Sequence, residues 1–239
     1  MNGRSWERRN EPRTAGYGSS RRAPAGSRDG DKIRLEGIGV TCRTVGAKVH
    51  AMEVSLSYEC IRIGDARRTG ILFDWEKWLR SADELYGRFA DRLEGDSPFD
   101  YHEVASVGFL SNAAAMAGYL PINEYDVFKR GKSDKRTKVR GRADLWFDTG
   151  PRCYSFEFKR TRRPVTTGYL GQRLEQAFSD VECVDRDEYH HAAACLVTVA
   201  REPVRIDTCR RFAAGAGIDA AYIIGPRNEP AFLFFRLRS

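Results

Sequence analysis

Three residues in the middle of the chain have side chains suited to metal-assisted chemistry on a phosphate group. Asp144 is followed by Glu157 and Lys159, with the apolar Phe158 between the last two. Hard cations such as Mg²⁺ bind oxygen ligands and keep several waters, so one or two carboxylates can make a site. A lysine beside such a metal can orient an attacking water and offset phosphate charge. The alternative is an ion pair on a solvated strand face.

Two short strands must position these side chains, and a turn at residues 148–151 joins them, since Gly and Pro interrupt strands. Side chains alternate between the faces of a strand, so Asp144, Glu157 and Lys159 can share one face while aromatic and aliphatic neighbours face a core. With the turn centred near its second and third residues, Asp144 is expected opposite Ser155 and diagonal to Glu157. A register shift of one residue would move Asp144 to the wrong face.

The order of Asp144 and the run Glu157-Phe158-Lys159 resembles the motif of the PD-(D/E)XK nuclease superfamily, which has the restriction-endonuclease-like fold. The family's proline before the Asp is Ala143 here. The resemblance implies an α/β fold with an αβββαβ core, in which helices flank a mixed central sheet. It covers roughly residues 99–199.

The resemblance also implies roles for particular residues. Asp144 and Glu157 would hold Mg²⁺ or Mn²⁺, and Lys159 would orient the attacking water. In proteins of this kind, a helix before the core sheet often carries an acidic residue that joins the metal site, and Glu103 matches that place. The alternative for Glu103 is a carboxylate that only stabilises the first turn of its helix through the helix dipole.

Basic residues flank the acidic cluster on both sides along the chain, which suits contacts with a phosphate backbone. An exposed loop that only aids solubility is the alternative. Some branches of the resembled family place a glutamine on the next helix; Gln172 matches that place, although the tyrosine expected four residues later is Gln176 here. The residues expected to contact nucleic acid are Lys138, Arg140, Arg142, Arg160, Arg162, Arg163 and Gln172.

The composition favours a polyanionic partner. The chain has 239 residues and a net charge of +7, and its pI of about 9.2 points to nucleic acid first and a membrane surface second. No apolar run reaches the roughly 18 residues of a membrane span, and the N-terminus lacks the apolar region of a secretory signal. Six scattered cysteines indicate reduced thiols. We therefore expect a cytoplasmic protein.

Three regions are expected along the chain. Residues 1–31 are basic, rich in Gly, Ser and Pro and nearly free of aliphatic residues, which is typical of a disordered tail. Residues 32–97 are expected to form an N-terminal strand and helix extension. Residues 98–239 are expected to form the nuclease-like domain.

Hydrophobic periodicity predicts the remaining elements. A capping box at Ser81 favours a break in the first helix, and Ser97 or Asp100 is expected to cap the second. Trp75 and Trp78 are interpreted as core residues rather than stacking platforms. The helices are expected at 71–93, 99–119, 168–184 and 208–215, and the strands after the N-terminal extension, apart from the central hairpin, at 124–128, 192–199, 221–224 and 231–237.

These observations predict a metal-dependent nuclease that hydrolyses phosphodiester bonds, with DNA favoured over RNA and a homodimer left open. The first alternative is a catalytically inactive nucleic-acid-binding protein of the same fold. The second is a structural or partner-binding protein in which the basic charge only aids solubility. Other enzyme classes are disfavoured because the sequence lacks a phosphate-binding loop, a nucleophile elbow and a zinc-binding His-Glu-X-X-His helix.

Overall fold

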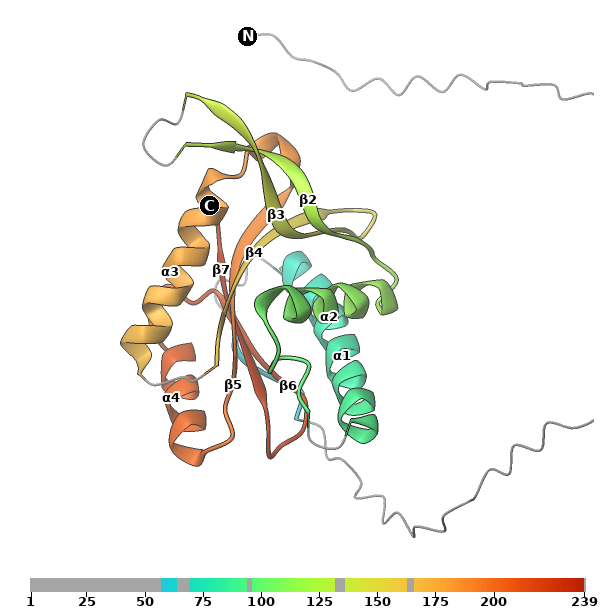
Figure 1. Cartoon of the computed structure of the whole chain (residues 1–239), viewed down its shortest axis with the longest axis vertical. Coiled ribbons are helices and arrows are strands. Elements are labelled where there is room, and N and C mark those ends of the chain that lie inside the picture. The colour runs from blue at the N-terminus through green and yellow to red at the C-terminus, as the bar shows by residue number, and fades with distance from the viewer. Residues whose placement is uncertain (1–56, 64–68, 94–95, 132–135, 163–165, 239) are drawn as a thin grey trace, which may run out of the picture. The chain divides into compact units, whose positions relative to one another are not determined.

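The computed structural model shows an α/β protein in which four helices pack against a seven-stranded mixed sheet (Figure 1). None of the helices it describes is long and apolar enough to cross a membrane. The expected basic tail lies outside the described part of the chain. The described residues are 57–63, 69–93, 96–131, 136–162 and 166–238.

The sheet order is β1-β6-β7-β5-β4-β3-β2, and β5 runs parallel to β4 while the other neighbouring pairs are antiparallel. The parallel strand expected at 192–199 is therefore confirmed. The elements are β1 (Glu59–Ile63), α1 (Thr69–Arg92), α2 (Glu103–Met116), β2 (Leu120–Arg130), β3 (Lys138–Asp148), β4 (Cys153–Thr161), α3 (Thr167–Cys183), η2 (Arg186–Glu188), β5 (His191–Val199), α4 (Pro203–Ala213), β6 (Ala220–Ile224) and β7 (Ala231–Leu237).

The two faces of the sheet carry separate hydrophobic cores. Helices α1 and α2 cover one face and α3 and α4 the other (Figure 1). Trp75 and Trp78 are fully buried in the first core, as expected, and the Trp75 ring lies 4.6 Å from that of Phe235 on β7. The indole of Trp78 donates to the Leu110 carbonyl at 2.8 Å, which ties α1 to α2.

The N-terminal elements share this sheet and this core. Strand β1 pairs with β6 at one edge, and α1 packs on the first face beside α2. At the turn after β6, Gly225 has a φ of 92° and its N–H donates to Asp83 of α1 at 2.6 Å. A Cβ at Gly225 would lie 2.2 Å from the Tyr86 ring, so only glycine fits this close approach.

Three helix boundaries differ from the prediction. The break at Ser81 is wrong, because α1 continues through it with buried residues before and after. Helix α2 begins at Glu103 rather than near residue 99, and the side chain of His102, not Ser97 or Asp100, caps it by accepting from the Ala105 N–H. Helix α4 begins at Pro203, well before the expected residue 208. In α1, tertiary packing outweighs the local capping signal.

Candidate functional site

The central hairpin forms with a register two residues away from the predicted one. Trp146, rather than Asp144, lies opposite Ser155. The turn is centred one residue later than expected, since the Thr149 N–H donates to the Arg152 carbonyl at 2.9 Å. A shift of two residues preserves the face of each side chain. Asp144 therefore keeps the face expected for it.

Asp144 on β3 reaches across to the backbone of β4. Its Oδ2 accepts a hydrogen bond from the Phe158 N–H at 2.6 Å. Burial raises the pKa of this carboxyl, and the Phe158 N–H opposes the shift only in part. Asp144 is thus held beside the Glu-X-Lys segment by a backbone contact, with its charge poorly compensated.

Glu157 on β4 is almost completely buried, with 3% of its surface exposed. Its Oε1 accepts a hydrogen bond from the ammonium group of Lys129 on β2 at 2.7 Å. Burial and then the nearby charge of Asp144 raise the pKa of Glu157 to about 7, against the opposing effect of Lys129. A bound cation would relieve the repulsion between the buried carboxylate of Glu157 and the half-buried carboxylate of Asp144.

Lys159 lies at the centre of a group of oxygen atoms. Its Nζ donates to the Phe158 carbonyl at 3.0 Å and lies 3.6 Å from Glu103 Oε1 and 3.5 Å from Asp180 Oδ2. Burial alone would lower the pKa of this lysine, but the surrounding carboxylates outweigh burial and raise it. Lys159 is therefore a protonated cation in this arrangement, with its ammonium group directed at these oxygen atoms.

Glu103 is brought to this site from the start of α2. Besides its contact with Lys159, its Oε2 accepts from the Arg160 N–H at 2.9 Å. The helix dipole favours a carboxylate at this first position. The same position is therefore compatible with both roles considered for Glu103, that of a metal-site residue and that of a carboxylate that stabilises its helix.

Asp180 and Lys129 are two site residues that the sequence-based prediction did not include. Asp180 belongs to a polar stripe on α3, and the spacing of this stripe with Gln172 and Gln176 at one helical face is a signal that could have been found. Lys129 carried no such signal, because its contact depends on how β2 pairs with β3. An open hollow along α3, which we call the α3 hollow, is lined by Lys159, Gln172, Glu175, Gln176, Ser179 and Asp180.

The oxygen atoms at this site suit a hard cation, but few carboxylates are placed to bind it. Asp144, Glu157 and the Phe158 carbonyl are all oxygen donors, which suits Mg²⁺ or Mn²⁺ with waters completing the shell. Within the described ranges, however, no group of three or more His, Cys, Asp or Glu is placed to hold a metal ion. The part of Glu103 as a third ligand, direct or through water, stays a prediction.

The expected nucleic-acid contacts have different surroundings. Lys138 forms an ion pair with Asp185, and Arg142 lies 3.3 Å from Glu124. The half-buried guanidinium of Arg160 donates to the Phe99 carbonyl, which gives it a structural contact.

The other expected contacts differ in exposure. Arg140, Arg162 and Gln172 are exposed, and Gln172 lines the α3 hollow. Arg163 lies outside the described residues.

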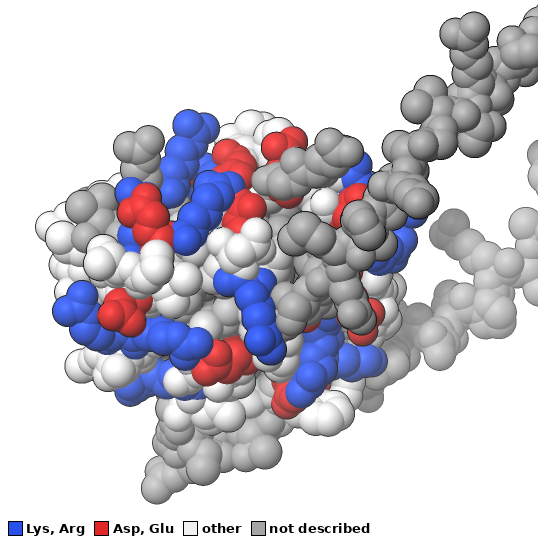
Figure 2. Space-filling view, turned by 90° about the horizontal axis from the view of Figure 1, so that it is seen from below, with Lys and Arg blue, Asp and Glu red and all other residues white. Residues whose placement is uncertain are grey.

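Charge on the surface is mixed where Figure 2 shows it. On the face seen from below, Lys and Arg side chains alternate with Asp and Glu. Ion pairs between neighbouring charges are also found among the described residues, as between Arg201 and both Asp100 and Glu229. Among the described residues on this face, the positive charge is therefore not gathered into one continuous patch.

Comparisons with protein-family models, with curated proteins and with solved structures give no match to this chain. A functional assignment therefore depends on the geometry and chemistry of the site itself.

Proposed function

We propose that the protein is a metal-dependent nuclease of the restriction-endonuclease-like fold that hydrolyses phosphodiester bonds, with DNA favoured over RNA. The observation that carries the proposal is the pair of repelling carboxylates, Asp144 and Glu157, beside the protonated Lys159 at an open hollow. The succession α2-β2-β3-β4-α3-β5 also supports the proposal, since it is the order of helices and strands in that fold's core. Fold resemblance by itself does not establish function.

The residues would divide the work between binding and charge compensation. Asp144, Glu157 and the Phe158 carbonyl would hold Mg²⁺ or Mn²⁺. The bound cation would lower the pKa of a water and offset charge on the phosphate. Lys159 would donate to a phosphate oxygen as negative charge develops there.

Glu157 must be ionised to serve as a ligand. Because its pKa is raised to about 7, cation binding and activity should increase as the pH rises through neutrality. Lys129 favours the ionised form in the absence of a cation and would have to share or release the carboxylate when a cation binds.

A nucleic-acid-binding protein without catalysis is the second candidate. The ammonium groups of Lys129 and Lys159 already contact the Glu157 carboxylate and the Phe158 carbonyl. In this candidate the two lysines permanently take the place of a metal. It predicts salt-sensitive binding with no metal-dependent turnover.

The test is cleavage by the purified protein. Plasmid, linear duplex, single-stranded DNA and RNA would be offered with Mg²⁺, Mn²⁺ or EDTA. We expect metal-dependent cleavage that falls at least about a hundredfold in Asp144→Asn and Lys159→Ala. Lys77→Ala, at an exposed lysine on α1, is the matched control and should retain full activity.

Glu157→Gln adds a variant that keeps the shape of the site. It should fold like the wild type, by circular dichroism, and lose metal-dependent cleavage. Undiminished cleavage by folded Asp144→Asn or Glu157→Gln would contradict the proposal. Salt-sensitive binding without any cleavage would favour the second candidate.

A further inference from the structure

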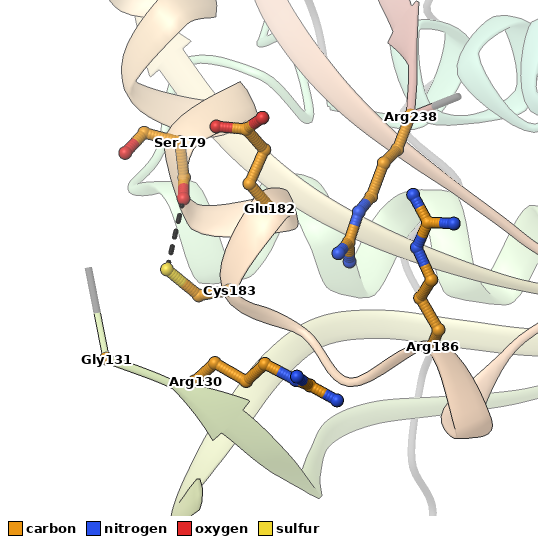
Figure 3. A pocket seen from close by; sticks show the side chains of 7 residues that line it. All are labelled: Arg130, Gly131, Ser179, Glu182, Cys183, Arg186 and Arg238. Atoms are coloured by element: carbon orange, nitrogen blue, oxygen red, sulfur yellow. Dashed lines mark hydrogen bonds between the residues drawn. The ribbon is translucent and has the colours of Figure 1, made fainter. Parts of the chain in front are cut away.

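A second concave site lies near the C-terminal end of α3 and has a different chemistry from the carboxylate site. It is a pocket of about 240 Å³, which we call the arginine pocket. Figure 3 shows that its lining residues come from β2, from α3, from η2 and from the residue after β7. Its lining residues are Arg130, Gly131, Ser179, Glu182, Cys183, Arg186 and Arg238.

The lining side chains have an excess of positive charge. Three arginines face one carboxylate, that of Glu182. Asp185 lies just outside, 3.3 Å from Arg130, but it also forms an ion pair with Lys138, whose positive charge offsets its negative charge. Counted over the lining residues alone, three arginines and one carboxylate leave an excess of two positive charges. A phosphate monoester carries about −1.5 to −2 at neutral pH, so it is the common anion that best matches this excess.

The arginines come from parts of the chain that are distant in sequence, and the fold holds one of them firmly. Arg238 donates to the carbonyls of Val181 at 3.1 Å and Val184 at 2.6 Å, which positions its guanidinium at the end of α3. Arg186 is exposed and lies on the short helix that follows α3. Arginine binds phosphate oxygens through paired N–H groups, and three arginines that line one pocket form a more specific site than a general basic surface.

The arginine pocket is adjacent to the α3 hollow, because Ser179 lines both. Asp180 beside Lys159 and Cys183 at the pocket are three residues apart on α3, less than one helical turn. A nucleic-acid strand lying along α3 could therefore place one phosphate at the carboxylate site and another at the pocket.

From this placement, we infer that the arginine pocket binds a phosphate monoester, either at the end of a nucleic-acid strand or on a free nucleotide. The strand-end source rests on the proposed nuclease function, whereas binding of the monoester does not. For a nuclease, such a pocket would favour substrates with a phosphorylated end and would position the strand relative to Asp144 and Glu157.

The experiment measures binding in EDTA, so that metal-dependent cleavage plays no part. Fluorescence anisotropy would compare labelled octathymidylate with a 5′-phosphate, with a 3′-phosphate or with neither, and dTMP would serve as competitor. We expect one phosphorylated form to bind at least about tenfold more tightly than the unphosphorylated form. Arg186→Gln should remove this advantage, whereas Arg88→Gln, at an exposed arginine on α1, should keep it.

The competitor separates the two sources. If dTMP binds as tightly as the phosphorylated strand, the pocket is assigned to a free nucleotide. If the phosphorylated strand binds much more tightly than dTMP, the pocket is assigned to a strand end. Equal affinities for all three strands without competition by dTMP would overturn the inference. An advantage that survives in folded Arg186→Gln would overturn it as well. Loss of cleavage activity with monoester binding intact would instead refute only the nuclease proposal.

Discussion

Two buried carboxylate clusters in this protein are built on opposite principles. Asp74 on α1 accepts from the Arg152 guanidinium at 2.8 Å and the Tyr154 hydroxyl at 2.6 Å. Burial would raise the pKa of Asp74, but these donors outweigh it and lower the pKa. At the candidate site, burial raises the pKa of both Asp144 and Glu157, and the nearby charge of Asp144 raises that of Glu157 further.

The difference separates a structural cluster from the candidate site. The Asp74 cluster holds the turn of the β3–β4 hairpin against α1, and its charge is compensated within the fold. The carboxylates of Asp144 and Glu157 are only partly compensated, at a cost in stability that a purely structural role would not require. Perturbed carboxylates of this kind concentrate at functional sites.

Removal of Asp74 should have the largest effect on stability. Asp74→Ala leaves the partly buried Arg152 without its partner and should lower the free energy of unfolding by about 4 kcal/mol. Glu157→Gln, in contrast, removes a buried charge that is poorly compensated and should raise it by up to about 3 kcal/mol at pH 8. Urea unfolding of the two variants measures both values. Equal losses would contradict the distinction between the clusters.

The pH dependence of stability should also differ between the clusters. Between the unfolded pKa of Glu157, about 4.3, and its folded pKa of about 7, the folded protein binds more protons than the unfolded chain. Stability should therefore fall as the pH rises across this window, by on the order of 3 kcal/mol in total.

Asp74 acts in the opposite direction, because its folded pKa is lowered. Its contribution is present above the unfolded pKa of about 3.9 and is lost as the pH falls through the folded value. Urea unfolding at pH 3 to 8 measures both trends. In Glu157→Gln the fall between pH 5 and 7 should flatten, and an unchanged slope in this variant would show that another group is responsible.

Thr149 should give the smallest effect. Its hydroxyl lies 3.4 Å from Asp74 and donates to the Arg152 carbonyl at 3.0 Å, so it is the weakest donor to the Asp74 cluster. Thr149→Ala should cost about 1 kcal/mol, with the lowered pKa of Asp74 nearly retained. Carboxyl titration by NMR, together with urea unfolding, would measure this. A loss as large as that of Asp74→Ala would mean that the turn, rather than the ion pair, dominates the cluster.

The sequence predicted the elements better than the contacts between them. Alternation placed Asp144, Glu157 and Lys159 on one face because side-chain direction is a local property of a strand. The register could not be read as securely, since moving the centre of the turn by one residue shifts every pair by two.

Contacts between segments that are distant in the chain could not be predicted from local sequence patterns. Lys129 reaches Glu157 only because three strands pair in a particular order, and Arg152 meets Asp74 across 78 positions. Ser81 shows the converse case, where a local capping signal is present but the packing of α1 overrides it. Asp180 could have been predicted from sequence, because its spacing places it on the same face of α3 as Gln172 and Gln176.

The contact between Trp75 and Phe235 has a consequence for the newly synthesised chain. Helix α1 is made early, but its aromatic face packs against β7, which is the last strand of the sheet to be made. At roughly 5 to 20 residues per second, a ribosome needs on the order of ten seconds to make the segment between them. During that interval Trp75 and Trp78 lack their contact with Phe235. The emerging chain therefore exposes an aromatic surface of the kind that chaperones bind.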